Sequence, residues 1–164
     1  MSDSQTTSPK RRLLFLSLDG VVHPQPQDKL PKSWDSGVLP ILGIRFFLAR
    51  PMRRIITLCE ELDIGIVLTS SWRHAGFSLT EFNQVFKGLV VGMTPDLSGN
   101  NYQGPLRERE VLAYLEAHGE GARFATVDSR PENFSSAELN LYIADPKGLF
   151  SDKLAAQIAD TLQQ

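Results

Sequence analysis

Short, continuous runs of hydrophobic residues alternate along the chain with longer segments in which hydrophobic residues recur at helical spacing. Continuous apolar runs of this kind are typical of strands buried on both faces of a parallel sheet. They lie at residues 13–18, 64–69, 88–92, 123–127 and 141–144. Because strands and helical segments alternate, the pattern predicts a three-layer α/β sandwich around a central, parallel, five-stranded sheet.

Helix boundaries are marked by capping residues. Ser78 and Glu81 have the spacing of a capping box, in which each side chain accepts a hydrogen bond from the other residue's backbone. Gly119 stands where a C-cap is expected, and Ser151 where an N-cap is expected. The predicted helices cover residues 51–62, 78–86, about 106–118, and 151 onward.

The length of 164 residues fits a single domain, since one core is typically built from ~100–200 residues. The polar start of the chain predicts a disordered tail over residues 1–11, so the domain covers 12–164. Residues 21–50 contain four prolines and are too short for a globular cap. Long loops in compact domains often act as lids, and we expect a flap here that uses Trp34, Phe46 and Phe47.

Composition excludes several classes of protein and names no partner. The hydrophobic content of 41% is ordinary for a globular protein, and a net charge of −2 gives no broad field for nucleic acid or membrane. The apolar run at 13–18 is shorter than a signal-peptide core and is followed by Asp19. The single cysteine, Cys59, lies among apolar helical residues and is expected to be a core thiol. A cytoplasmic protein is therefore expected.

Polar residues gather where three of the predicted strands end. Ligands of open parallel sheets bind beyond the carboxyl ends of the strands, so these residues are expected at one rim. Carboxylate oxygens suit Mg²⁺, and hydroxyl groups and guanidinium groups suit phosphate oxygens. The residues concerned are Ser17, Asp19, Thr69, Ser70, Arg73, Arg107, Arg109 and Asp128.

Four ordered segments carry a family resemblance. The first segment, SLDGVVH, resembles the DxDGVxH first motif of haloacid dehalogenase-like (HAD) phosphatases, and the second, IVLTSSWR, resembles their second motif. The helix start from Arg107 to Glu110 resembles the third motif, and ATVDSRPEN resembles the fourth. Further along the chain, LYIADPKGLF resembles the small HAD domains of Swiss Army Knife RNA repair proteins. The resemblance implies a Rossmann-like sheet and phosphoryl chemistry that uses Mg²⁺.

The resemblance also implies catalytic roles for individual residues. Asp19 matches the general acid that protonates the leaving group, and Arg107 matches the cation that steadies the nucleophile, with Arg109 as its rival. The nucleophilic aspartate falls on Ser17, and the second acid of the fourth motif falls on Ser129. A serine needs a neighbouring base before it attacks phosphorus, and the sequence shows none.

Binding roles follow in the same way. Thr69, with Ser70, matches the hydroxyl that holds phosphate, and Arg73 is a further candidate for that task. Asp19 and Asp128 match the metal ligands that remain. Since hard cations require several anionic oxygens, two carboxylates predict only weak binding of Mg²⁺.

Three functions stay open at this point. The favoured one is a HAD-like domain with a degenerate catalytic motif that is weakly active or inactive and binds a phosphorylated small molecule, a nucleotide or a protein partner. The alternative is an active, Mg²⁺-dependent phosphatase or nucleotidase acting on phosphate monoesters. A third is that Ser17 is a changed position in an otherwise active enzyme.

Overall fold

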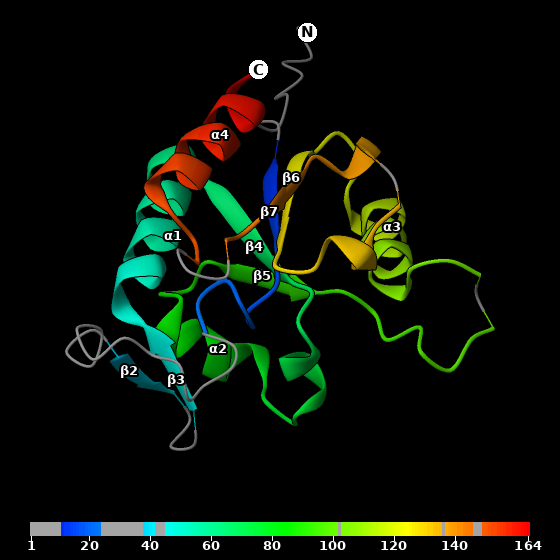
Figure 1. The fold of residues 1–164 in the computed structure, drawn as a ribbon, viewed down its shortest axis with the longest axis horizontal. Coiled ribbons are helices and arrows are strands. Elements are labelled where there is room, and N and C mark those ends of the chain that lie inside the picture. Colours follow the sequence, from blue (N-terminus) through cyan, green and yellow to red (C-terminus); the bar gives the residue numbers. More distant parts are fainter. Residues whose placement is uncertain (1–10, 24–37, 42–44, 102, 136, 146–148) are drawn as a thin grey trace, which may run out of the picture.

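The computed structural model describes residues 11–23, 38–41, 45–101, 103–135, 137–145 and 149–164. Its centre is a five-stranded sheet in the order β5-β4-β1-β6-β7, in which every neighbouring pair is parallel. This confirms the predicted α/β sandwich (Figure 1). The strands are β1 (Arg12–Leu16), β4 (Ile64–Leu68), β5 (Val90–Met93), β6 (Arg123–Asp128) and β7 (Leu141–Ile143).

The central position of β1 explains its uninterrupted apolar run. It pairs with β4 on one side and with β6 on the other, and the four residues from Leu13 to Leu16 are completely buried. Alternate side chains of a strand point to opposite faces, so both faces of β1 need apolar residues. Leu14 and Leu16 join the larger core cluster, whereas Leu13 and Phe15 join the smaller one.

Four α-helices cover the sheet in the part of the chain that is described. Helices α1 and α4 lie together against one face, and α3 covers the other (Figure 1). Helix α2 supplies Phe82 to the same core cluster as α1 and α4. The helices are α1 (Ala49–Leu62), α2 (Leu79–Val85), α3 (Leu106–His118) and α4 (Asp152–Gln163).

The predicted helix caps are confirmed. The hydroxyl of Ser78 accepts from the backbone of Glu81, whose carboxylate accepts from the backbone of Ser78. Ser151 accepts from the backbone N–H of Leu154 at the start of α4. Gly119 is the C-cap of α3, although its φ of −97° makes no use of the left-handed region that favours glycine.

The proline-rich insert contains a hairpin that the sequence analysis did not predict. Strands β2 (Val38–Ile41) and β3 (Arg45–Leu48) pair antiparallel immediately before α1. Phe47 was expected to serve a flap, but it is completely buried in the main core. The N–H of Leu48 donates to the carbonyl of Val22, which fastens the hairpin to the turn after β1. Trp34 and the side chain of Phe46 lie outside the described residues.

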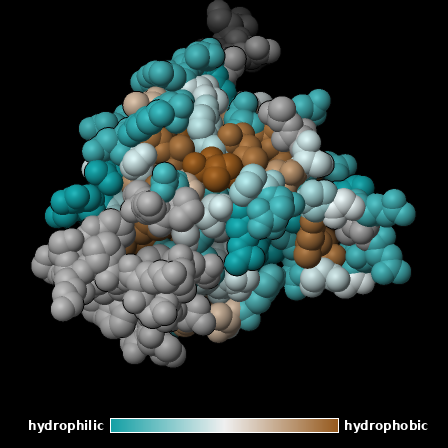
Figure 2. All heavy atoms as spheres, in the orientation of Figure 1, coloured by the Kyte–Doolittle hydropathy of each residue, from teal (hydrophilic) through white to brown (hydrophobic). Residues whose placement is uncertain are grey.

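Strand β7 forms one edge of the sheet. Figure 2 shows hydrophobic residues gathered over this part of the molecule, and Ile143 is 38% exposed. The hydroxyl of Tyr142 hydrogen bonds that of Thr161 and so ties the strand to α4. Among the described helices, none combines the length and the apolar character needed to cross a bilayer.

Candidate active site

Ser17, Thr69 and Asp128 form a row across three adjacent strands. The pairing of Leu16 with Leu68 and Val127 continues by one residue, because Ser17 N donates to Val127 O and Thr69 N donates to Leu16 O, both at 3.0 Å. Neighbouring strands lie about 4.8 Å apart, so the three residues are side by side at the carboxyl edge. The two strand neighbours of Ser17 are therefore a hydroxyl and a carboxylate.

The strand alternation places this row on the side of the sheet that α3 covers. Leu13, Phe15 and Val67 pack there against Val111 and Tyr114 of α3, and the row continues the same alternation. Helix α3 begins at this edge, so its first turn brings Arg107 toward the row. The charge of Asp128 acts on Arg107, which agrees with this placement.

Several buried polar atoms in this region have no hydrogen-bond partner among the described residues. They are Oγ1 of Thr69, Nε and Nη1 of Arg107, and Oγ1 of Thr126. Thr69 is completely buried, and Nη1 of Arg107 lies 3.9 Å from Glu110 Oε2, too far for a hydrogen bond. Unpaired buried donors are costly, about 1–3 kcal/mol each and more for charged groups. Such donors mark a position for acceptor atoms.

The surroundings of Arg107 and Asp128 perturb both side chains. Burial, and then the neighbouring charge of Arg73, lowers the pKa of the Arg107 guanidinium. Burial raises the pKa of the Asp128 carboxyl, although its Oδ1 accepts from the backbone N–H groups of Ser129 and Arg130 at 2.7 and 2.9 Å. Perturbed groups at the carboxyl edge of such a sheet are typical of functional sites.

Arg73 lies at the same edge, and its guanidinium group hydrogen bonds to other groups of the protein. Its Nη1 donates to the carbonyl of Thr69 at 2.5 Å, its Nε to the carbonyl of Thr94 at 3.2 Å, and its Nη2 to Glu110 Oε2 at 2.5 Å. This guanidinium joins the ends of β4 and β5 to α3. All three guanidinium nitrogens of Arg73 are therefore engaged with protein groups, and its phosphate-binding role stays a prediction.

Glu110 is a residue of this site that the sequence analysis did not single out. Its side chain is 2% exposed, and besides Arg73 it accepts from the backbone N–H of Leu97 in the loop before α3. Its spacing from Arg107, Val111 and Tyr114 along the helix was the available signal, because these positions share the face of α3 that turns toward the sheet.

Asp19 lies in the turn that follows β1. The backbone N–H groups of Val21, Val22 and His23 all point to the carbonyl of Leu18, which makes this turn tight. Asp19 Oδ1 accepts a 2.9 Å hydrogen bond from the indole Nε1 of Trp72. The ring of Trp72 lies 5.4 Å from that of His23, so two aromatic rings pack behind the carboxylate.

Ser129 connects the turn after β1 to the end of β6. Its hydroxyl donates to the carbonyl of Asp19 at 2.8 Å. Gly20, with a φ of +75°, approaches so closely that a Cβ built there would lie 2.5 Å from Ser129 Cβ and Oγ. The first and fourth motif segments are therefore in direct contact.

Two of the expected phosphate-binding residues make other contacts. The hydroxyl of Ser70 accepts from the backbone of Trp72 as the N-cap of the short helix η3 (Ser71–His74). Arg109 is exposed, and its Nη2 lies 3.4 Å from the carbonyl of Gln103. Of the two candidate arginines in α3, Arg107 is the one that lies beside Asp128.

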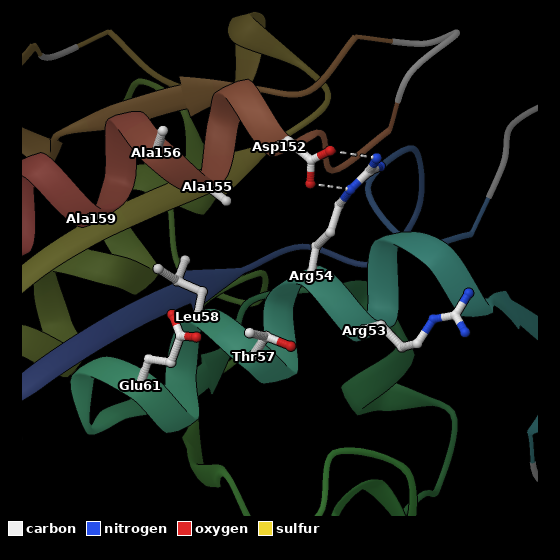
Figure 3. A pocket seen from close by; sticks show the side chains of 9 residues that line it. All are labelled: Arg53, Arg54, Thr57, Leu58, Glu61, Asp152, Ala155, Ala156 and Ala159. Carbon is white, nitrogen blue, oxygen red and sulfur yellow. Dashed lines mark hydrogen bonds and ion pairs between the residues drawn. The ribbon is translucent and has the colours of Figure 1, made fainter.

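A groove lies on the opposite face of the molecule, between α1 and α4 (Figure 3). Arg54 of α1 and Asp152 of α4 face each other across it, in an ion pair whose N–O distance is 2.6 Å. Small residues of α4, including Ala155 and Ala159, line its wall. None of the predicted site residues lines this groove.

The family of the chain follows from comparison with known proteins. The family described as "HAD domain in Swiss Army Knife RNA repair proteins" matches residues 13–153. The chain belongs to this family. Searches of curated proteins and of solved structures found no significant match. The HAD resemblance predicted from the four motifs is confirmed, and the fold is that of HAD-like phosphohydrolases.

HAD domains generally use Mg²⁺. Mg²⁺ demands nearly octahedral oxygen coordination. Here the Oδ1 of Asp128 is taken by two backbone N–H groups and the Oδ1 of Asp19 by an indole. Ser17 offers a neutral hydroxyl, and no group of three acids, histidines or cysteines occurs in the described part of the chain. These residues do not fit a typical HAD magnesium site.

Proposed function

We propose that this HAD domain binds a phosphorylated ligand at the carboxyl edge of its sheet and hydrolyses it slowly or not at all. The buried donors of Thr69 and Arg107, which have no hydrogen-bond partner among the described residues, support the binding of such a ligand. Phosphate oxygens accept hydrogen bonds from both kinds of group. A bound phosphate would therefore relieve the cost of leaving these donors buried and unpaired.

Ser17, which the motif resemblance matches to the family's nucleophilic aspartate, is the reason to expect slow or absent turnover. A serine hydroxyl becomes nucleophilic only when an adjacent base removes its proton. No described residue hydrogen bonds the Ser17 hydroxyl, and Asp19 already accepts from Trp72. Slow or absent phosphoryl transfer follows from this lack of activation.

The chemistry of the ligand is restricted by charge. A net charge of −2 does not favour contacts along a nucleic-acid backbone, so a single terminal phosphate is the better candidate. Since the family description refers to RNA repair, an oligoribonucleotide with one end phosphate belongs among the first ligands to test, beside mononucleotides and small phosphate monoesters.

The proposal is tested by two assays on the intact chain. Binding of phosphate compounds is measured by calorimetry, and release of inorganic phosphate from the same compounds is measured with and without Mg²⁺. We expect binding that is lost in Thr69→Val and in Arg107→Met, with little hydrolysis. Rapid, Mg²⁺-dependent release by the unmodified chain would instead favour an active phosphatase.

A further inference from the structure

The donors of the site are accompanied by acceptors. Thr69 Oγ1 and the Arg107 guanidinium offer buried hydrogen atoms, and Asp128 stands in the same row on the far side of Ser17. The Oδ2 of Asp128 receives only a long, 3.5 Å bond from Asn133. A ligand in this row thus meets the Thr69 hydroxyl at one end, a carboxylate oxygen of Asp128 at the other, and the Arg107 guanidinium beside Asp128.

This mixture distinguishes two kinds of tetrahedral anion. An oxyanion without a proton, such as sulfate, can accept hydrogen bonds from Thr69 and Arg107. It has no hydrogen to donate to the carboxylate of Asp128, so two negatively charged oxygens face each other there. A phosphate group that carries a proton accepts at the same donors and donates its O–H to the carboxylate. Each group is then paired, which is the condition for burying polar atoms at low cost.

Charge around the row acts in the same direction. Arg73 and Glu110 form a buried ion pair and largely neutralise each other. Arg107 also lies 3.9 Å from Glu110, and its charge acts on the carboxylate of Asp128. A phosphate group with one proton carries less negative charge than the fully ionised group, so this carboxylate repels it less.

In the usual HAD arrangement a divalent cation would separate the carboxylates from the phosphate. The oxygen ligands described above do not fit that ion. Ser17 and Ser129 match two of the four motif positions that are usually acidic, and each of the two remaining carboxylates, Asp19 and Asp128, has one oxygen engaged in hydrogen bonds. A proton on the ligand serves the same purpose here, since it places a positive hydrogen between two oxygens.

We propose that the site recognises a singly protonated phosphate group, as inorganic phosphate or as a phosphate monoester, and holds it without a divalent cation. The proposal rests on the proposed function, which requires only that phosphate binds at this edge. It adds that the ion Mg²⁺ is dispensable and that phosphate is preferred over sulfate.

The test is calorimetric titration of the full chain with inorganic phosphate and, separately, with sulfate, each in EDTA and in Mg²⁺. We expect equal phosphate affinity in EDTA and in Mg²⁺, and sulfate binding weaker by at least about tenfold. Asp128→Asn should reduce the difference between the affinities for phosphate and for sulfate, because the amide that replaces the carboxylate can donate a hydrogen bond to either anion. Arg109→Met, on the exposed side of α3, is the matched control for Arg107→Met and should leave both affinities unchanged.

The outcomes separate the two proposals. Phosphate binding that requires Mg²⁺, or equal binding of sulfate and phosphate, would overturn the inference and leave the proposed function standing. No phosphate binding under either condition would overturn both. Circular dichroism shows whether Arg107→Met is folded. Thr69→Val removes the other buried donor of the site without changing the charge, and it therefore tests phosphate binding independently of Arg107→Met.

Discussion

The indole N–H of Trp72 donates a 2.9 Å hydrogen bond to the carboxylate of Asp19. Trp72 is 3% exposed and belongs to the main core, whereas Asp19 lies in the turn after β1. The core therefore sets the orientation of the acid that the motif resemblance matches to the general acid. Trp72 thus belongs to the core and also fixes a candidate site residue.

Trp72→Phe should test this orientation. The change keeps an aromatic ring in the core but removes the donor, and we expect the free energy of unfolding to fall by about 1–2 kcal/mol. Urea unfolding gives the measurement. Asp19→Asn supplies the other arm of a double-mutant cycle, and a coupling energy near zero between the two changes would show that this bond contributes nothing.

Ser17→Asp should restore chemistry at the centre of the row. An aspartate is ionised at neutral pH without a base and adds a third carboxylate beside Asp19 and Asp128. We expect Mg²⁺-dependent hydrolysis of a generic phosphate monoester at least about tenfold above the parent, and loss of that gain on adding Asp19→Ala. Ser17→Asn, which has nearly the same shape and no charge, is the control.

One result would change the interpretation of position 17. Equal activity in the parent and in Ser17→Asp would mean that catalysis does not pass through this residue. A further gain on adding Ser129→Asp is not expected, because the Ser129 hydroxyl donates to the carbonyl of Asp19 and a carboxylate cannot.

Glu110→Ala should be strongly destabilising. It leaves Arg73 as an uncompensated charge whose side chain is 4% exposed, and breaking a buried pair in this way costs roughly 3–5 kcal/mol. Glu116→Ala, an exposed position on the same helix, should change the free energy of unfolding by less than about 0.5 kcal/mol. Similar unfolding midpoints for the two variants would contradict the role given to Glu110.

Gly20→Ala should disturb the contact between the two motif segments. The residue has a φ of +75°, and the new Cβ would lie 2.5 Å from Ser129, so we expect a loss of roughly 1–3 kcal/mol from backbone strain and a further loss from the clash. Gly76 also has a positive φ, of +85°, but has open space around it. Gly76→Ala therefore reports the strain alone, and equal losses at the two glycines would argue against a tight contact.

Cys59 should be unreactive in the folded protein. Burial, and then the charge of Glu60, raises the pKa of this thiol to about 12. In the unfolded chain this thiol ionises near its ordinary pKa of 9.0, below the pKa it has in the fold. The thiol therefore makes the free energy of unfolding decrease as the pH rises above 9.0, by roughly 1.4 kcal/mol per pH unit. Labelling by a disulfide reagent should be slow until denaturant is added, and Cys59→Ala should lack this extra pH dependence. Fast labelling of the native chain would contradict the prediction.

Much of the fold could be predicted because buried parallel strands and capped helices leave strong local signals. The hairpin of β2 and β3 could not, since Pro40 lies within β2 and proline normally argues against a strand. The strand ends were misjudged by a residue or two where, as after Leu16, the chain passes directly into a tight turn.

The site was predictable only in part, for a related reason. Motif order located Asp19, Thr69 and Asp128 at one edge. The buried pair of Arg73 and Glu110 was not predicted, because charged residues usually indicate surface and the helical spacing of Glu110 does not by itself identify its partner. The alternatives Arg107 and Arg109 differ by two positions on a helix, and only the placement of α3 against the sheet distinguishes them.

The contact between Ser129 and Asp19 joins residues that are 110 positions apart, and it lies beside the central strand, which comes first in the chain. During synthesis, β1 emerges long before its partner β6, so its apolar residues remain uncovered on one edge until most of the chain has been made. The site is therefore among the last parts of the domain to assemble. A chain interrupted before residue 123 would have a complete first motif in sequence and no site in space.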